Sequence, residues 1–341
     1  TIDGGTGTDT LTANSTDLSA TTGALSIANV EKINLTNVGT SVIDATNITS
    51  ATELAVLTNT TSTTITNLAA GVAVGAGHNN TDGAASGLFD ISLADATGTS
   101  DALTFNLNDT TTGNNNAIEV KASGIETVTF DVTDDTDTSN ADSVLDVDSL
   151  NATSIVVNGS AADTGNTLSL GTLDTDTTSV TATGYGGILT ATAGSAIATT
   201  FDLKGDRAHN ITGSSKNDTF TMGDTTGSAP TFDGNGGTDV LNITLGNGAA
   251  DFTNISDIDT INIPVTTSAA ITFNSSGVAA GLDAATAVNF TGGNALSTIS
   301  IDGTDPLTDS NSSTLGPWVK KSLFKTSTTA LMSFSLISCL P

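Results

Sequence analysis

The chain has 341 residues, with 36 acidic and 8 basic side chains, one cysteine and a formal net charge of −28. This charge excludes the basic face that binds nucleic acid, and one cysteine excludes a disulfide scaffold. No run of 18 apolar residues occurs, so no membrane-spanning helix is predicted. Of the acids 32 are Asp, and Thr is about one residue in five. Asp favours turns and Thr favours strands, so the composition predicts an all-β protein.

The first predicted element is a glycine-rich turn that leads into a short strand. Residues 4–12 read Gly-Gly-Thr-Gly-Thr-Asp-Thr-Leu-Thr, which fits the Ca²⁺-binding nonapeptide Gly-Gly-x-Gly-x-Asp-x-U-x, where U is apolar. Glycines allow the turn and direct carbonyls inward, and a carboxylate completes the all-oxygen shell that Ca²⁺ prefers. The predicted metal-site residues here are Gly4, Gly5, Gly7 and Asp9, and the alternative is a glycine turn without a metal.

Strand patterns recur along the rest of the chain. Apolar and polar residues alternate in segments such as 33–35, 104–107, 128–132 and 241–245. Short helices at residues 50–57 and 281–288 are only weakly indicated. We therefore predict an elongated parallel β-solenoid or β-roll with few or no helices, with β-sandwich-like segments as an addition to it.

An internal repeat supports an array of similar units. Residues 3–11 recur as residues 233–241, and a second matched element follows each copy after about 20 residues, at 29–35 and 257–263. A third instance of that second element lies at residues 124–130. Its shared pattern is apolar, acid, Thr or Lys, apolar, polar, apolar, which predicts equivalent strands of one array. Chance recurrence in a low-complexity chain is the alternative.

Degenerate versions of the nonapeptide cluster between residues 205 and 241. Lys216 stands where the motif has glycine, and Asn235 replaces another glycine. We predict stacked turns with one or two Ca²⁺ sites in this segment. The predicted metal-site residues here are Gly213, Asp218, Asp233, Gly234, Asn235, Gly237 and Asp239.

No catalytic pattern is present. His78 and His209 lie in Gly- or Asn-rich segments, and neither a Gly-x-Ser-x-Gly nor a His-Glu-x-x-His motif occurs. The acidic run at residues 131–137 lacks glycine and fits a solvated loop. We expect no enzyme activity, no catalytic or organic-cofactor residues, and Ca²⁺ as the only cofactor.

Five segments are expected along the chain. A β unit that opens with the nonapeptide covers 1–75, a Thr- and Asp-rich solenoid 76–200, the degenerate Ca²⁺-binding β-roll 201–245, and the start of a second β unit 246–305. Residues 306–341 hold the single Trp and Cys and no acid after Asp309, which fits an artefactual or disordered tail. Because the chain starts at Thr1 without a leader pattern, we expect a fragment of a longer protein.

The chain resembles the RTX-type surface-layer proteins of Gram-negative bacteria. The matching elements are residues 4–12, 30–35, 94–107, 125–130, 152–159, 205–241 and 258–263. The resemblance implies an extracellular, Ca²⁺-dependent protein of the bacterial surface, secreted by a type I system, that self-associates into a lattice. Cell-surface polysaccharide is a further implied partner, through regions absent from this chain. The family's C-terminal secretion signal is not visible, so an RTX adhesin or the non-catalytic part of a secreted RTX hydrolase are the alternatives.

Overall fold

The computed structural model describes most of the first 264 residues and short segments after them. The described residues are 1–14, 18, 26–36, 41–57, 62–77, 86–109, 117–134, 143–159, 167–223, 229–244, 248–250, 254–264, 271–273, 287–291, 299–302 and 331–334. The chain divides into two compact units, Thr1–Gly194 and Ser195–Pro341. Each unit is described by itself.

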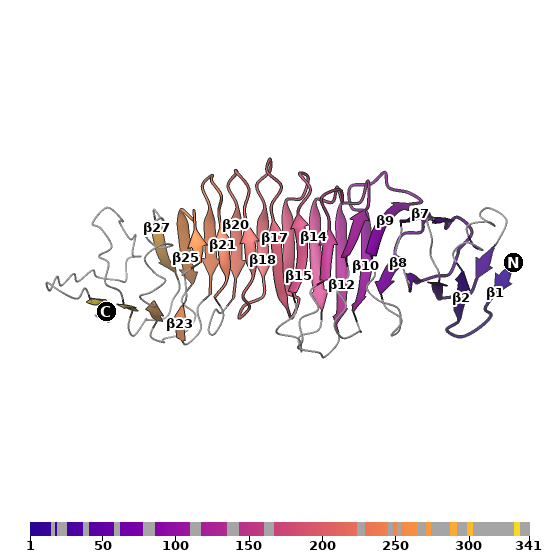
Figure 1. Ribbon diagram of the computed structural model, residues 1–341, viewed down its shortest axis with the longest axis horizontal. Helices are drawn as coiled ribbons and strands as arrows, with labels where there is room; N and C mark the ends of the chain where they lie inside the picture. The colour runs from indigo at the N-terminus through magenta and orange to yellow at the C-terminus, as the bar shows by residue number, and fades with distance from the viewer. Residues whose placement is uncertain are drawn as a thin grey trace, which may run out of the picture. The chain divides into compact units, whose positions relative to one another are not determined.

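In the first unit, strands that follow one another in the sequence mostly alternate between two parallel sheets (Figure 1). The first sheet contains, in spatial order, β2 (Thr10–Asn14), β4 (Lys32–Thr36), β6 (Glu53–Val56), β8 (Ala73–Gly77), β10 (Ala102–Asp109), β12 (Thr127–Asp134), β14 (Ser154–Gly159) and β16 (Ser179–Gly184). The second contains β5 (Ser41–Asp44), β7 (Thr63–Leu68), β9 (Ser86–Leu93), β11 (Ala117–Lys121), β13 (Ser143–Asp146), β15 (Thr167–Thr172) and β17 (Ile188–Thr192). A parallel pair of β1 (Ile2–Asp3) and β3 (Ile27–Ala28) completes the unit.

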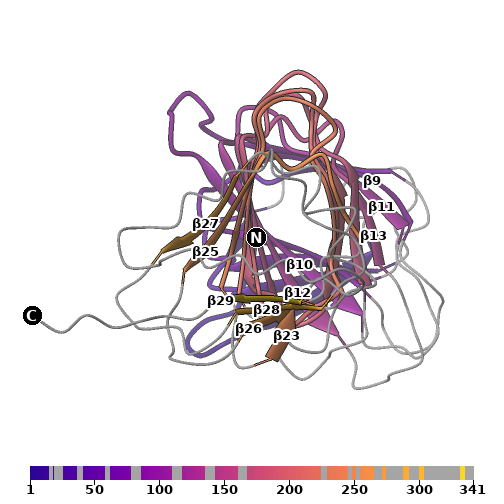
Figure 2. The same cartoon turned by 90° about the vertical axis from the view of Figure 1, so that its left-hand side faces the viewer.

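Each turn of this coil adds one strand to each sheet, which makes the unit a β-solenoid. Figure 2 shows β9, β11 and β13 on one wall of the coil, with β10 and β12 on another. Many neighbouring strands stay in register, so that Phe105 of β10 is aligned with Phe130 of β12. The register shifts within three pairs, β7–β9, β14–β16 and β15–β17. Parallel strands about 4.8 Å apart therefore place equivalent side chains in columns along the coil.

The second unit continues the same pattern with shorter strands. One parallel sheet contains β18 (Thr200–Leu203), β20 (Thr219–Met222), β22 (Val240–Ile243), β25 (Thr260–Pro264) and β27 (Ala287–Thr291). A second contains β19 (Asn210–Thr212), β21 (Thr231–Asp233) and β24 (Ile255–Ser256). A third contains β23 (Gly248–Ala250), β26 (Ile271–Phe273), β28 (Ile299–Asp302) and β29 (Leu331–Phe334), and the β28–β29 pair is antiparallel.

Alternate residues of the strands fill the interior. In the first unit the Phe89 and Phe105 rings meet edge to face at 5.2 Å, and the Phe105 and Phe130 rings meet at 5.9 Å. All three rings are fully buried. Phe201 and Phe220 of the second unit stack at 5.6 Å. The columns that the register creates thus become aromatic ladders inside the coil, where burial of large rings supplies much of the stabilisation.

The predicted fold class is confirmed, because the elements of the described residues are strands and almost all pairs are parallel. The three copies of the second repeat element form β4, β12 and β25, which occupy the equivalent sheet of their units. The weakly indicated helix at residues 50–57 was wrong, since this segment contains β6. The pattern misled because β6 is buried on both sides of its backbone at Leu54, Ala55 and Val56, which hides the two-residue alternation.

Among the described residues, no helix is long and apolar enough to cross a membrane.

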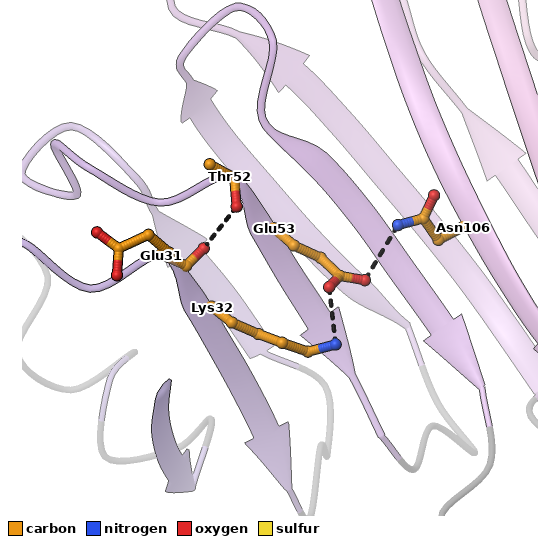
Figure 3. Close-up of polar contacts among 5 residues, drawn as sticks. All are labelled: Glu31, Lys32, Thr52, Glu53 and Asn106. Carbon is orange, nitrogen blue, oxygen red and sulfur yellow. Dashed lines mark hydrogen bonds and ion pairs between the residues drawn. The ribbon is translucent and has the colours of Figure 1, made fainter. Parts of the chain in front are cut away.

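Polar side chains on the outer face of the first sheet link several turns (Figure 3). The Lys32 ammonium lies 2.8 Å from the Glu53 carboxylate, whose other oxygen accepts a hydrogen bond of 3.0 Å from the Asn106 amide. The Glu53 side chain reaches Asn106 across β8, where a Cβ at Gly75 would lie only 3.0 Å from Glu53 Oε1. The glycine therefore leaves the space for a contact that joins β4, β6 and β10.

We predict that the aromatic ladder is the main packing contribution of the first unit. Phe130→Ala should lower the free energy of unfolding by about 3–5 kcal/mol, because it removes a fully buried ring and leaves a cavity. Val42→Ala is the control, since Val42 is 51% exposed and its truncation should cost less than about 0.5 kcal/mol. Urea unfolding followed by circular dichroism measures both. Equal effects of the two variants would contradict this account.

Candidate cation-binding turns

Three six-residue turns occupy equivalent positions. Each comes just before a strand of the sheet that contains β2 in the first unit, or of the sheet that contains β20 and β22 in the second. They cover residues 4–9 before β2, 213–218 before β20 and 234–239 before β22. Each turn opens with a glycine and ends with an Asp. The register of β20 with β22 pairs Thr219 with Val240, so the last two turns lie one above the other in the coil.

The opening glycine is required by a close backbone approach. A Cβ added to Gly4 would lie 2.0 Å from the Asn29 carbonyl oxygen, and one added to Gly234 would lie 2.0 Å from the Asp257 carbonyl oxygen. These distances are far below van der Waals contact, so no other residue fits without displacing the next turn. The glycines thus set how closely successive turns stack.

Left-handed backbone occurs later in two of the turns. Gly5 and Gly7 have φ values of 86° and 131°, and Asn235 and Gly237 have 62° and 126°. Asn is the residue other than glycine that adopts this conformation most readily, which explains why it substitutes at the Gly5 position. The third turn is built differently, because Lys216, at the position of Gly7, does not have a positive φ.

The two copies of the repeat have the same hydrogen bonds 230 residues apart. The Asp9 N–H donates to Glu31 Oε2 at 2.7 Å, and the Asp239 N–H donates to Asp259 Oδ2 at 2.8 Å. The Glu31 and Asp259 N–H groups donate in return to the Asp9 and Asp239 carbonyls, both at 3.1 Å. The sequence repeat is therefore a repeat of atomic contacts, in which one turn fixes the next.

The last Asp of two turns has a carboxylate oxygen without a hydrogen-bond donor. These atoms are Asp9 Oδ2 and Asp239 Oδ2, and both are inaccessible to solvent. The whole Asp239 residue is 0% exposed. A buried carboxylate oxygen without a partner is costly, so it marks a position where a cation or a proton is favoured.

The electrostatics of Asp239 agree with this interpretation. Burial raises the pKa of the Asp239 carboxyl from 3.8 to about 6, the N–H of Asp218 opposes the rise, and the negative charges of Asp218, Asp259 and Asp257 add to it. The site therefore has an excess of negative charge for its degree of burial. A bound cation would relieve both the desolvation and the repulsion.

The third Asp is satisfied by the protein itself. Asp218 is also 0% exposed, but Oδ2 accepts the Ser214 N–H at 2.6 Å and Oδ1 accepts the Thr199 N–H at 2.6 Å. The Ser214 hydroxyl lies 3.0 Å from Oδ2 and 3.3 Å from Oδ1. The contacts of Asp218 thus differ from those of Asp9 and Asp239.

The other predicted site residues have structural contacts. The Asp233 carboxylate accepts the Asn235 N–H at 3.1 Å, which makes a local Asx turn. The Asn235 amide lies 3.4 Å from the Gly213 carbonyl oxygen, which places Gly213 next to turn 234–239. A Cβ at Gly237 would lie 2.3 Å from the Lys216 carbonyl oxygen. These residues shape and stack the turns.

The residues of turns 4–9 and 234–239 fit Ca²⁺ by their chemistry. Each offers one unpartnered carboxylate oxygen, at Asp9 or Asp239, and a backbone carbonyl of the next turn beside the opening glycine, at Asn29 or Asp257. Carboxylate and carbonyl oxygens are the ligands that Ca²⁺ prefers. A bound ion would supply positive charge that holds two turns together. Within the described ranges, no group of three or more His, Cys, Asp or Glu side chains is placed to hold a metal ion.

Three residues that form hydrogen bonds with these turns were not predicted from the sequence. Glu31 and Asp259 were recognised as the acid of a strand pattern, but their role as acceptors for the preceding turn was not predicted. Ser214 stands at a glycine position of the motif, and its hydrogen bonds to Asp218 were not predicted. The available signal was the spacing of about 20 residues between the acids, since one coil of the solenoid brings such positions together.

Comparison of the chain with protein-family models, with curated proteins and with solved structures found no match.

The close approach of the Asp257 carbonyl to Gly234 predicts that any larger residue at position 234 is destabilising. Gly234→Ala should destabilise the second unit by about 1–3 kcal/mol, because the added methyl group meets the Asp257 carbonyl and the Asp239 carboxylate. Thr238→Ala in the same turn is the control, since Thr238 is exposed and contributes its backbone N–H. Urea denaturation measures both variants. Tolerance of Ala at position 234 would show that the turns are not packed in this way.

A second prediction concerns acid sensitivity through His209. Its ring is fully buried, with Nε2 2.9 Å from the Lys204 carbonyl oxygen. Burial lowers the pKa of His209 from 6.5 to about 4, with Arg207 contributing. The unfolded chain therefore binds a proton that the folded chain excludes, so stability should be lost as pH falls from about 6.5 to 4.

His209→Gln should reduce this loss by about 2–3 kcal/mol, since Gln does not titrate and its amide can still donate to a carbonyl. Urea midpoints at pH 7.5 and pH 4.5, compared between the wild type and the variant, measure the difference. An identical pH dependence of the two proteins would refute the assignment.

Proposed function

We propose that the chain is a structural segment of a bacterial surface layer whose β-solenoid is stabilised by extracellular Ca²⁺ and which then self-associates. The observation that carries the Ca²⁺ part is the unpartnered, buried Oδ2 of both Asp9 and Asp239. Because both copies of the repeat contain this unpartnered oxygen, it is a recurring feature of the repeat and not a local irregularity of one turn. The surface-layer part rests on the resemblance of the sequence to that family and on the compatibility of a β-solenoid with a scaffold role.

The charge of the chain supports a dependence on cations. A formal charge of −28 opposes compaction and also opposes the approach of a second copy. Ion pairs inside the protein offset little of it, since the described residues contain Lys32–Glu53 and Lys121–Glu119 as salt bridges. Cations from solution would therefore stabilise both the fold and the assembly. A dissociation constant on the order of 0.1–1 mM would make the chain fold outside the cell, where Ca²⁺ is abundant.

We predict that Ca²⁺ raises the stability of the wild-type chain in a saturable way and that Mg²⁺ at the same concentration does not. Urea unfolding and circular dichroism during a titration from chelator to 10 mM Ca²⁺ provide the measurement. At 10 mM and a dissociation constant of about 0.1–1 mM, mass action gives roughly 1.4–2.7 kcal/mol for each site. The double variant Asp9→Asn and Asp239→Asn should lose this gain.

The matched control is Asp131→Asn, which removes an acid of the outer sheet face without touching the turns. This variant should keep the Ca²⁺ response, because Asp131 accepts a hydrogen bond from Asn158 and lies outside turns 4–9 and 234–239. Electron microscopy of the Ca²⁺-saturated wild type then tests for ordered sheets. A chain that is indifferent to Ca²⁺ would overturn the proposal, whereas a Ca²⁺ response without sheets would favour a monomeric binding module such as an adhesin.

A further inference from the structure

The contacts of Ser214 differ from those of every residue at its position in the other turns. Its N–H points to Asp218 Oδ2 at 2.6 Å, and its hydroxyl contacts the same carboxylate at 3.0 Å. The hydroxyl oxygen also accepts the Lys216 N–H at 2.9 Å. Ser214 is 1% exposed, so these bonds form away from water, where they are strongest.

The equivalent residues Gly5 and Asn235 turn their N–H groups the other way. The Gly5 N–H donates to Asp3 Oδ1 and the Asn235 N–H to Asp233 Oδ1, both at 3.1 Å. Both residues have positive φ, and each follows an Asp by two positions. Ser214 does not have a positive φ and follows Thr212, which offers no carboxylate. The inward N–H is thus linked to the loss of the outer Asp and of the left-handed residue.

Another turn shows that a backbone N–H group can donate to the last Asp of a turn elsewhere in the coil. The Gly98 N–H donates to Asp101 Oδ2 at 3.0 Å, and the Asp101 N–H donates to Glu126 Oε2 at 2.7 Å. Asp101 comes just before β10, as Asp218 comes just before β20. Hydrogen bonds from protein donors are therefore a second way to compensate the negative charge of the carboxylate that ends the turn, and they need no ion.

Turn 213–218 also forms the surface on which turn 234–239 lies. Asn217 Oδ1 accepts the Thr238 N–H at 2.9 Å, and Asp239 Oδ1 accepts the Asp218 N–H at 2.7 Å. The Gly213 N–H donates to the Asp233 carbonyl at 2.7 Å. Turn 234–239, which contains the unpartnered Asp239 oxygen, thus packs on turn 213–218, whose Asp218 carboxylate is already hydrogen-bonded by the protein.

We propose that Ser214 takes the place of a cation in turn 213–218, so that this turn closes without Ca²⁺ and serves as the template for the Ca²⁺-dependent turn 234–239. The template half of this proposal rests on the proposed function, and the closure half does not. It follows that the sequence motif overstates the number of ions. Turns ending in Asp9 and Asp239 require a cation, whereas the turn ending in Asp218 does not.

The first test is hydrogen exchange of the full chain in chelator. The Thr199 and Ser214 amides should be protected, because both donate to the buried Asp218 carboxylate, whereas the Thr238 amide should exchange faster and become protected when Ca²⁺ is added. Fast exchange of the Ser214 amide in chelator, in a chain that is otherwise folded, would overturn the closure. Protection of Ser214 in a chain that binds no Ca²⁺ would keep the closure and reject the proposed function.

The second test converts the closed turn to the open kind. Ser214→Gly should speed exchange of the Thr199 amide by about tenfold or more in chelator, because Asp218 loses its hydroxyl donor and the turn regains glycine freedom. Ca²⁺ should reverse this loss, and equilibrium dialysis with Ca²⁺ alone should detect one more bound ion than in the wild type. Ser214→Ala also removes the hydroxyl but does not regain the glycine freedom, so it should show a smaller loss and no extra ion.

The control is Ser215→Ala, which removes an exposed hydroxyl one residue away that donates to the Ser195 carbonyl. This variant should leave the exchange of Thr199 and the number of bound ions unchanged. Equal ion counts for Ser214→Gly and the wild type would overturn the idea that Ser214 replaces a cation. A loss in Ser215→Ala as large as that in Ser214→Gly would do so as well, since it would reflect general softening of the turn.

Discussion

The structure depends on one constraint, which is that each coil must lie in register on the coil before it. Parallel pairing brings equivalent residues to about 4.8 Å, so any feature of one turn is repeated as a column. For Phe105 and Phe130 the column is a buried ladder that stabilises the interior. For Asp218, Asp239 and Asp259 it is a row of carboxylates linked through backbone N–H groups. The same geometry that strengthens an apolar column strains a charged one.

The acids at the start of the strands have a structural reason to be there. Four of them accept the N–H of the acid one coil earlier, namely Glu31, Glu126, Asp239 and Asp259, whereas Asp218 accepts the N–H of Thr199. Such charge-assisted bonds are stronger than bonds to a neutral acceptor. One oxygen of Asp239 is used in this way and the other is left over. The remaining oxygen can be met by an N–H and a hydroxyl, as at Asp218, or by a cation. The choice depends on one residue at the second position of the turn.

Much of the fold could be predicted because its signals are local. Alternation in segments such as β12 and glycine-rich turns reflect contacts within one or two coils. The repeat of residues 3–11 at 233–241 reproduces such contacts in each copy. The buried segment of β6 was harder, because Leu54, Ala55 and Val56 are all buried and do not alternate. The candidate site was located by its glycines, but the role of Ser214 was not foreseen. Serine at a glycine position suggests a loss of function until its partner, Asp218, is known.

The acidity of the chain then has a different meaning from ordinary surface charge. Asp3, Asp44 and Asp95 lie at exposed corners, where hydrogen bonds from neighbouring side chains and N–H groups lower their pKa values and keep them ionised. These carboxylates accept backbone N–H groups just after β1, β5 and β9, so acids of this kind accompany the turns of the coil and not a binding site. A longer solenoid of this sequence type must accumulate negative charge that its few basic residues cannot balance. Under the proposed function, cations from solution would offset this charge, which suits a scaffold that becomes rigid where divalent cations are plentiful.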